Sequence, residues 1–507
     1  FRILMPTRKM NQSLRSYHKY LITKGSSYRN ANLKISGLAE KLHHGEFKFA
    51  ADDDEIRSLA EKFSTRYSRI TVGTSAGVGL AKLSVKEDIG VDLPKNTNLP
   101  RLSCPKFWRK SLRRHALRQV EQVNRLMGRT RKTVSPYISR HVAHSWFERN
   151  KCNRALLEAM EAENDFGQVF TLAELSDLGV SNPINRRNEL MTRLDGFDRY
   201  GIEDDANEWV TILYTMTCPS YCHPTSNNRP NPKYRGATPI EAQEWLNQNW
   251  KRARTAYGKL KIKVYGFRIA EPHHDGTPHW HVLLWVPKHQ EQQLTAILRH
   301  YAFSENGNER GALKHRFDAV KIDPKKGRAT GYIAKYIAKN IDGFGVDFDY
   351  EAEQPSAIAA VHARIWASVW GIRQFQQIGG PPVTVYRECR KIASNIESIY
   401  KEPSELDREI IEAANVGDWC AFTIKMGGVV CPRDARPLRP AHFPKECTGY
   451  YGDILLKLVG LWSYNQPKPI AYSKPNWVIR HKISGAGLAT EQAAQQAPPA
   501  SALEFCQ

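Results

Sequence analysis

Two apolar runs separated by a short polar turn constrain this sequence more than any other feature. Residues 262–271 (IKVYGFRIAE) and 279–286 (HWHVLLWV) each predict a strand, because both are rich in β-branched, aromatic and aliphatic residues. The triplet His274-Asp275-Gly276 between them is typical of a tight turn. Strands joined by so short a connection pair as an antiparallel hairpin, since a parallel pair needs a long crossover. The chain is therefore predicted to contain an antiparallel sheet.

The segments on either side of this hairpin extend it into a larger sheet. Residues 209–217 and 316–322 predict two more strands, and helices are predicted at 239–259, 290–303 and 330–342. The first six of these elements follow the order β-α-β-β-α-β, which is the split βαβ or ferredoxin-like order. We therefore predict an α+β fold whose antiparallel sheet carries two helices on one face. The helix at 330–342 lies outside this repeat and is free to cross the other face.

The charge of the chain indicates the kind of partner. Lys and Arg number 74 against 52 Asp and Glu, a net charge of +22, which favours a polyanionic partner such as nucleic acid. Residues 106–132 hold ten Lys or Arg against Glu121 alone, with Phe107 and Trp108 among them. This stripe predicts contact with a nucleic-acid backbone. A solvated basic helix is the alternative.

The remainder of the chain surrounds the sheet-forming part. An ordinary domain has about 150 residues, so a chain of 507 residues predicts several domains. We divide it into a basic, largely helical region (1–135), a helical lead-in (136–200), the sheet domain (201–385), a mixed region (386–483) and a disordered tail (484–507). The first residue is Phe rather than Met, which is consistent with a trimmed or partial sequence.

Several classes of protein are excluded by what the sequence lacks. No apolar run approaches 18 residues and no signal-peptide core opens the chain, so we expect a cytoplasmic protein without a membrane partner. Nine cysteines without a CxxC pair argue against a disulfide scaffold and a zinc ribbon. Cys218, Cys222 and His223 form a candidate metal cluster that no second pair completes. No GxxxxGK[ST] sequence occurs, so no ATP motor is predicted.

The histidines of the second hairpin strand suggest a metal site. Because side chains alternate along a strand, His279 and His281 lie on one face and Trp280 on the other. Two imidazoles at this spacing can bind one divalent ion. His273 and His274 are spare candidates as ligands, but we expect them to be surface loop residues.

The length of the turn decides whether a carboxylate joins this pair. If the turn is a three-residue loop with Gly276 in the left-handed conformation, Glu271 lies opposite His279 on the same face. A two-residue loop would place Glu271 opposite Trp280 instead. We predict the first arrangement, and with it a metal site of Glu271, His279 and His281. These ligands suit Mg²⁺ or Mn²⁺ when a substrate phosphate completes the coordination.

A second group of polar residues lies on the helix predicted at 330–342. Tyr332 and Tyr336 are four residues apart on one face, and Lys335 and Lys339 each follow a tyrosine by three residues. The alternative is a purely structural role, in which the helix is amphipathic and the tyrosines pack in the hydrophobic core. However, a separate apolar stripe is available for the core: Ile333, Ile337 and Ile341. The phenols and ammonium groups are thereby left for chemistry.

Tyrosines beside a metal site suit transfer of a DNA strand. A tyrosine that attacks a phosphodiester keeps the bond as a phosphotyrosine, so the strand can be rejoined without ATP. A phenol has a pKa near 10, so ionising it at pH 7 costs about 4 kcal/mol. A nearby ammonium group lowers this cost, and a metal on the scissile phosphate stabilises the transition state by several kcal/mol. Two tyrosines permit two successive transfers.

Three segments carry a resemblance to a known family. EPHHDGTPHWHVLLW, ATGYIAKYIAKNIDG and WGIRQFQQIGGPPVTV resemble the phage replication gene A protein family, and the strand ending TMTCPS fits the wider group of HUH endonucleases. The resemblance covers roughly residues 140–395. It implies a rolling-circle replication initiator that nicks one origin strand, forms a 5′-phosphotyrosyl link, leaves a 3′-OH primer and later rejoins the strand.

The resemblance also implies roles for residues and partners. Tyr332 and Tyr336 match the family's paired nucleophiles, and His279 and His281 match its metal histidines. Glu271 would be the third ligand. Lys335 and Lys339 resemble the positioning lysine beside such tyrosines. The implied partner is single-stranded origin DNA, with a separate host helicase and polymerase completing replication.

Other interpretations of the same residues remain open. A two-tyrosine HUH transposase or relaxase would use the same chemistry on the end of a mobile element. A hydrolytic metallonuclease would use the metal site without a covalent intermediate. A non-catalytic basic DNA-binding protein would use neither.

Overall fold

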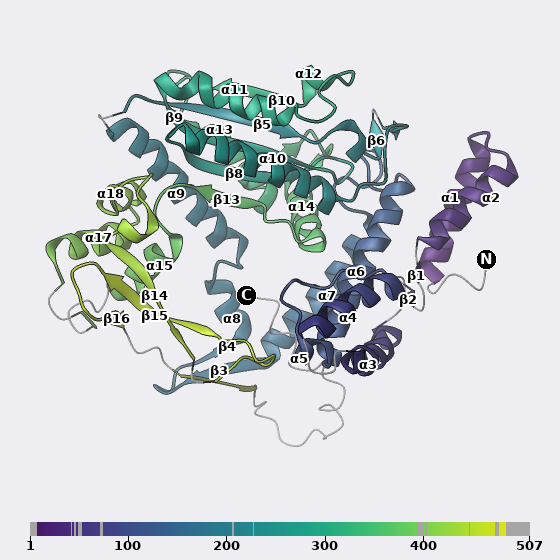
Figure 1. Cartoon of the computed structure of the whole chain (residues 1–507), viewed down its shortest axis with the longest axis horizontal. Coiled ribbons are helices and arrows are strands. Elements are labelled where there is room, and N and C mark those ends of the chain that lie inside the picture. The colour runs from purple at the N-terminus through teal and green to yellow at the C-terminus, as the bar shows by residue number, and fades with distance from the viewer. Residues whose placement is uncertain are drawn as a thin grey trace. The chain divides into compact units, whose positions relative to one another are not determined.

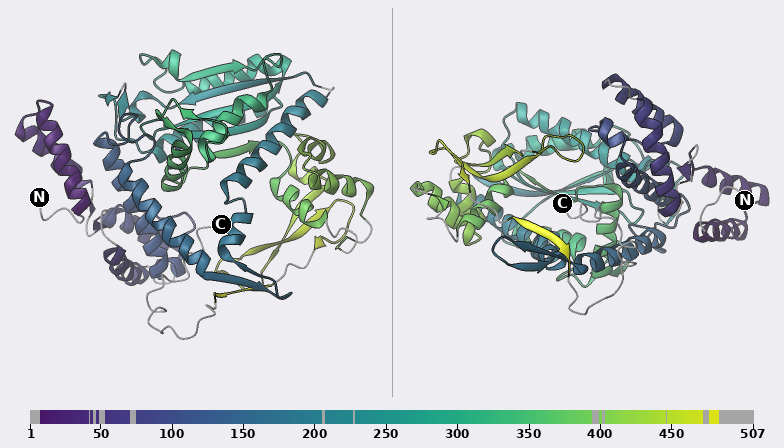
Figure 2. Two further views of the ribbon diagram at one scale, coloured as in Figure 1. Left: turned by 180° about the vertical axis from the view of Figure 1, so that it is seen from behind. Right: turned by 90° about the horizontal axis from the view of Figure 1, so that it is seen from below.

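The computed structural model describes residues 8–41, 43–44, 47–48, 53–70, 75–204, 207–226, 228–393, 399–400, 403–445, 447–471 and 476–482. The chain divides into two compact units, one of residues 1–144 with 446–455 and one of residues 145–445 with 456–507. Figure 1 labels the elements of both, and Figure 2 gives two further views. The tail predicted at 484–507 lies outside the described residues. The predicted domain boundaries stay predictions.

The first unit is built mainly of helices. They are α1 (Arg8–Thr23), α2 (Tyr28–Glu40), α3 (Asp53–Ile70), α4 (Ser75–Ile89), α5 (Leu99–Leu102) and α6 (Pro105–Leu126), with a short hairpin of β1 (His43–His44) and β2 (Phe47–Lys48). α7 (Arg140–Ala159) begins in this unit and ends in the second. In the core, Trp108 of α6 packs against Phe63 and Tyr67 of α3, with ring centroids 5.8 and 5.2 Å apart.

The structure corrects one part of the prediction made for the basic stripe at 106–132, the part that concerns its aromatic residues. Phe107 and Trp108, predicted beside a nucleic-acid backbone, are buried because they lie on the face of α6 that packs on α3 and α5. Of the ten basic residues, all of which are described, Lys106 and Arg114 are the exposed ones. Two others, Arg109 and Arg113, form ion pairs with Asp53. The two aromatic rings are therefore closed to DNA, while most of the basic residues are partly exposed, and contact of the stripe with a nucleic-acid backbone stays a prediction.

The second unit contains a five-stranded antiparallel sheet (Figure 1). Its order is β10 (Phe317–Lys321), β5 (Trp209–Thr217), β9 (Pro278–Pro287), β8 (Tyr265–Pro272) and β13 (Phe375–Ile378). The first four strands and the helices α10 (Pro239–Lys259), α11 (Glu291–Ala302) and α13 (Ala329–Ile341) confirm the predicted elements and their sequence order. β13 was not predicted, and it pairs with β8 at the sheet edge. The fold is α+β with antiparallel sheets.

The two faces of this sheet carry different helices, as predicted. On one face, α10 and α11 pack against the strands; the indole nitrogen of Trp280 in β9 donates a 3.0 Å hydrogen bond to Gln243 of α10. The other face is covered by α13 and by α9 (Pro183–Glu203). There, Phe197 of α9 packs against Tyr265 of β8 at 5.1 Å between ring centroids. The isoleucines of α13 enter the same core.

Further elements complete the second unit. They are α8 (Leu172–Leu178), β6 (Thr225–Ser226), β7 (Arg229–Pro230), α12 (Ala312–His315), β11 (Phe348–Asp349), β12 (Gln354–Pro355), α14 (Ser356–Trp370), α15 (Val383–Ala393), α17 (Glu405–Asn415), α18 (Trp419–Lys425), β14 (Leu438–Pro444), β15 (Leu456–Ser463) and β16 (Ile470–Ala471). Residues of α15, α17 and α18 share one apolar core with the sheet.

The lead-in predicted as helical at 136–200 also contains strands, which is a correction. β3 (Met160–Asn164) and β4 (Val169–Thr171) form a hairpin that turns at Gly167, where φ is +76°. β17 (Trp477–His481) pairs with β3 and completes a three-stranded sheet. The partner strand lies more than 300 residues away in the sequence, so local patterns carry no trace of this pairing.

Candidate active site

The hairpin of β8 and β9 decides which side chains share a face of the sheet. The backbone N–H of His273 donates to the carbonyl of Thr277 at 2.8 Å, which closes a three-residue loop. The last residue of that loop, Gly276, has φ of +78°. As a result, Glu271 pairs directly with His279. The predicted register is confirmed.

Glu271, His279 and His281 come together as a compact group of possible metal ligands. The Nε2 atoms of the two histidines are 3.1 Å apart, and Oε2 of Glu271 lies 3.7 Å from Nε2 of His279 and 3.6 Å from Nε2 of His281. Ligands about 2.1 Å from one ion are themselves separated by roughly 3.0–3.6 Å, so this donor set fits a single divalent cation. Among the described residues, no other group of three such ligands is found.

Burial sets the charge state of these three side chains. It raises the pKa of Glu271 to about 7 and lowers the pKa of His281 to about 3, and it lowers that of His279 well below the usual value. Both imidazoles are therefore neutral at pH 7, which is the form that binds a metal. Thr215 of β5 lies opposite His281, with its hydroxyl 3.2 Å from Nδ1. A bond from Nδ1–H to this hydroxyl leaves Nε2 free as the ligand atom.

The helix α13 brings the tyrosines to this group. The ring of Tyr336 packs on the ring of His281, with centroids 4.0 Å apart, and is half-buried. Tyr332 lies one turn earlier on the same side of the helix and is 40% exposed. Burial and the nearby Glu271 raise the pKa of Tyr336, while Lys339 acts in the opposite direction. The single ammonium group does not offset the effects that raise the pKa, so the phenol of Tyr336 is protonated at pH 7.

The two lysines predicted to position a phosphate have different surroundings. Lys339 is largely buried and forms a 3.0 Å ion pair with Asp349. Nearby Glu271 also contributes to raising the pKa of Lys339, so this ammonium group stays charged. Lys335, one turn earlier, is exposed. Of the two, Lys335 is the one open to a phosphate from solvent.

The apolar stripe predicted on α13 is confirmed. Ile333, Ile337 and Ile341 are at most 2% exposed and belong to the core beneath the sheet. The helix ends at Ile341, and its end is closed by Gly343, whose φ is +76° and whose N–H donates to the carbonyl of Ala338 at 2.7 Å. The core tyrosine alternative does not hold for Tyr332, because its ring is exposed.

The sequence did not predict the two amide side chains that support Glu271, one directly and one through the other. The side-chain NH₂ of Asn340 donates to Oε1 of Glu271, and Gln374 donates to the carbonyl oxygen of the Asn340 side chain at 3.2 Å. Asn340 is four residues after Tyr336, and its NH₂ also reaches the backbone oxygen of that residue at 2.8 Å. The signal available in the sequence was a polar residue continuing the spacing of the tyrosines on the helix.

We expect the variant Asn340→Leu to bind Mn²⁺ about 10- to 100-fold more weakly than the parent protein. Removing the amide leaves a buried carboxylate oxygen of Glu271 without its donor, and such supporting bonds typically contribute that much to metal affinity. Calorimetric titration with Mn²⁺ measures the effect. The control is Gln293→Leu, the same change on the exposed side of α11. Equal affinity in both variants would show that Asn340 does not support the site.

The prediction that His273 and His274 are simple surface residues is wrong. Both are partly buried, and the ring of His273 lies 4.1 Å from that of His279 between centroids. Nδ1 of His274 is 3.1 Å from Oε1 of Glu351, and Nδ1 of His273 is 3.7 Å from the same atom. Glu351 follows these residues by more than 70 positions, so only the folded chain places it over the turn.

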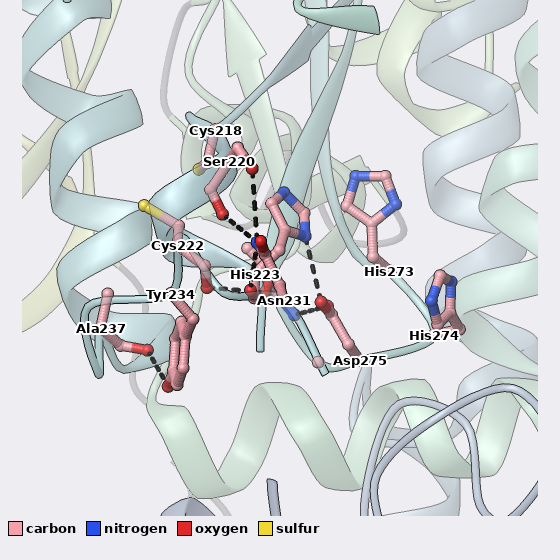
Figure 3. Close-up of polar contacts among 12 residues, drawn as sticks. Cys218, Ser220, Cys222, His223, Asn231, Tyr234, Ala237, His273, His274 and Asp275 are labelled. Carbon is pink, nitrogen blue, oxygen red and sulfur yellow. Dashed lines mark hydrogen bonds and ion pairs between the residues drawn. The ribbon is translucent and has the colours of Figure 1, made fainter. Parts of the chain in front are cut away.

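The candidate cluster of Cys218, Cys222 and His223 does not form a metal site among the described residues. As Figure 3 shows, His223 points to Asp275 instead, with Nδ1 3.1 Å from Oδ2. The thiol of Cys218 is buried and lies 3.4 Å from the carbonyl oxygen of Pro278. This segment therefore fixes the hairpin turn beside the metal ligands.

The chain is similar to a family of known proteins. The family described as bacteriophage replication gene A protein matches residues 86–344, which is just over half of the chain. The chain belongs to this family. The replication gene A protein of Escherichia phage 186 is 36% identical over 410 residues, covering 79% of this chain and 58% of that protein.

Two further relatives have related names. The replication protein of Haemophilus phage HP1 is 35% identical over 417 residues, covering 80% of this chain and 52% of that protein. A Salmonella typhimurium protein named "Probable replication endonuclease from prophage-like region" is 32% identical over 442 residues, covering 84% of this chain and 54% of its own length. This replication gene A family member thus spans little more than half the length of these relatives. No solved structure matches it.

None of the helices among the described residues is long and apolar enough to cross a membrane.

Proposed function

We propose that this replication gene A family member initiates phage DNA replication as a metal-dependent nicking and joining enzyme. The observation that supports this most is the packing of Tyr336 on His281, which puts a phenol against a buried group of metal ligands. The names of the relatives, replication protein and replication endonuclease, agree with such a role. The β-α-β-β-α-β order of the sheet also supports a ferredoxin-like HUH endonuclease domain.

In the proposed reaction, the phenolic oxygen of Tyr332 or Tyr336 attacks the scissile phosphorus. The bond from phosphorus to the 3′ oxygen breaks as the new bond to tyrosine forms, so the number of phosphoester bonds is unchanged. The 3′ oxygen gains a proton and becomes the free 3′-OH primer, while the 5′ end stays on the tyrosine. Attack by a 3′-OH on the phosphotyrosine reverses the step and rejoins the strand.

The remaining residues of the site have distinct proposed roles. Glu271, His279 and His281 would hold a divalent cation, Mg²⁺ or Mn²⁺, which would supply Lewis-acid polarisation of the scissile phosphate. Lys335, exposed on the tyrosine helix, positions the phosphate. Lys339 stabilises the negative charge of the site from its pair with Asp349.

The proposed partner is a single strand of phage origin DNA in the bacterial cytoplasm. The 507 residues contain no GxxxxGK[ST] sequence, so we propose that a separate host helicase unwinds the duplex. A host polymerase would extend the 3′-OH.

The test is a cleavage assay with 3′-labelled single-stranded DNA from the candidate origin and Mn²⁺ or Mg²⁺. On a denaturing gel we expect labelled DNA at the mass of the protein, and none in EDTA. Shortened DNA with a free 5′ phosphate would instead indicate a hydrolytic nuclease, and DNA bound but uncut would indicate a non-catalytic protein. Sequencing the junction distinguishes a replication origin from the end of a mobile element.

A further inference from the structure

A short hairpin that follows α13 in the sequence contacts the candidate active site through one of its faces. It consists of β11, β12 and the loop between them. Asp349 of β11 pairs with Lys339, and Glu351 in the loop contacts His274. Asp349 also accepts the backbone N–H of Glu351 at 2.9 Å. Asp349 and Glu351 are thus both engaged with groups of the site.

The other side of the hairpin exposes two aromatic rings. Phe348 is 39% exposed and Tyr350 is 76% exposed, and their ring centroids lie 5.4 Å apart at an interplanar angle of 71°. Phe344, four residues before Phe348, is 69% exposed, and the guanidinium of Arg187 lies 4.0 Å from the centre of its ring. Rings this exposed contribute little to the core. A cluster of such rings on the surface is typical of a binding site.

The chain places these rings close to the reacting groups. Tyr350 stands between Asp349 and Glu351, and adjacent Cα atoms are about 3.8 Å apart. Its two neighbours touch Lys339, three residues after a proposed nucleophile, and His274, beside the metal ligands. A DNA strand whose phosphate lies at the tyrosines therefore has its next nucleotides within reach of this hairpin.

The chemistry of the hairpin favours the bases of that strand over its phosphates. Asp349 is paired with Lys339, so this ammonium group is largely neutralised and offers a phosphate little attraction. An unpaired base is uncharged, and its flat face stacks on aromatic side chains whatever its sequence.

We propose that Phe348 and Tyr350 form a base-stacking subsite that holds an unpaired nucleotide flanking the scissile phosphate. The subsite rests on the proposed nicking function for its place on the DNA, but its affinity for single strands can be measured without cleavage. It would hold the strand in register while the tyrosines react.

The test compares the parent protein with the double variant Phe348→Ala with Tyr350→Ala in EDTA. Fluorescence anisotropy measures binding to a labelled single strand of 20 thymidines and to a duplex of the same length. We expect the double variant to bind the single strand roughly 5- to 100-fold more weakly. The slope of log K against log salt should stay the same, because no phosphate contact is lost. Binding to the duplex should be unchanged, since its bases are already stacked.

Two controls keep the result specific. Tyr464→Ala removes an equally exposed ring, 70% exposed, at the end of β15, and should leave single-strand affinity unchanged. Phe348→Tyr with Tyr350→Phe keeps both rings and should bind as the parent does. Thermal unfolding checks that all variants fold.

The outcomes separate the subsite from the nicking function. Weaker single-strand binding by the alanine variant supports the subsite even if the parent protein forms no covalent product. Equal binding by the alanine variant and the parent, with covalent product formed by both, overturns the subsite and leaves the nicking function standing. A lower salt slope, or a changed oligomeric state with equal DNA affinity, would also overturn it, because either points to another kind of contact.

Discussion

The double variant Tyr332→Phe with Tyr336→Phe should form no covalent product with single-stranded DNA, while binding that DNA as tightly as the parent protein. The two changes remove only hydroxyl groups, so the ring of residue 336 keeps its packing on His281. Without a nucleophile of this kind we expect cleavage to fall by a factor of roughly a thousand or more. The assay is the 3′-labelled band at protein mass, with affinity measured in parallel.

The single variants refine this expectation. In the proposed mechanism either tyrosine can form one phosphotyrosine, so each single variant should still give a labelled band. The second transfer needs both, and a DNA already attached to one tyrosine should not be passed to the other in either variant. Tyr464→Phe removes a phenol far along the chain from α13 and serves as the matched control. A labelled band of parental intensity from the double variant would place the nucleophile elsewhere.

The electrostatics of Tyr336 agree with the proposed cation. Burial and Glu271 raise the pKa of the phenol, and Lys339 only partly opposes them. A divalent ion held by Glu271 and the two histidines would add two positive charges beside this carboxylate and would so outweigh its effect on the phenol. The same ion therefore would assist both the phosphate and the attacking oxygen.

The parts of the site that were predictable from the sequence depend on local rules. Alternation along β9 placed His279 and His281 together, and the loop chemistry of Gly276 fixed the register that brings in Glu271. The four-residue spacing along α13 separated the isoleucine stripe from Tyr332. Each of these features is decided by residues within about ten positions of one another, so the pattern carries the information.

The unpredicted parts depend on contacts between distant segments. Asn340 meets Glu271 across 69 positions, and Glu351 meets His274 across 77. The burial of Trp108 depends on α3, which comes some 40 residues earlier. No local period marks such partners, because they are selected by how helices and strands pack. Two consequences for function follow. The aromatic residues of the basic stripe are buried and so are not open to DNA. The hairpin of β11 and β12, which follows α13, lies beside the candidate active site.

The variant His279→Ala should lose metal-dependent cleavage. It removes one of three ligands from a buried group, and Glu271 and His281 alone make a poor site for Mg²⁺ or Mn²⁺. Since a bound metal contributes several kcal/mol of charge stabilisation, we expect cleavage to fall at least about a hundredfold. Single-strand affinity in EDTA should match the parent protein, because the ring of His279 is buried and offers little to DNA.

The control for this variant is His289→Ala, which removes an exposed imidazole just after the same strand. It should cleave as the parent does and respond equally to Mn²⁺. Calorimetric titration should show Mn²⁺ binding in the control and at least tenfold weaker binding in His279→Ala, since a ligand contributes no less than the bonds that orient it. Parental cleavage by His279→Ala that still depends on added metal would move the metal site away from the hairpin. Because Tyr336 packs on His281, that result would also remove the reason for placing the nucleophile on this helix.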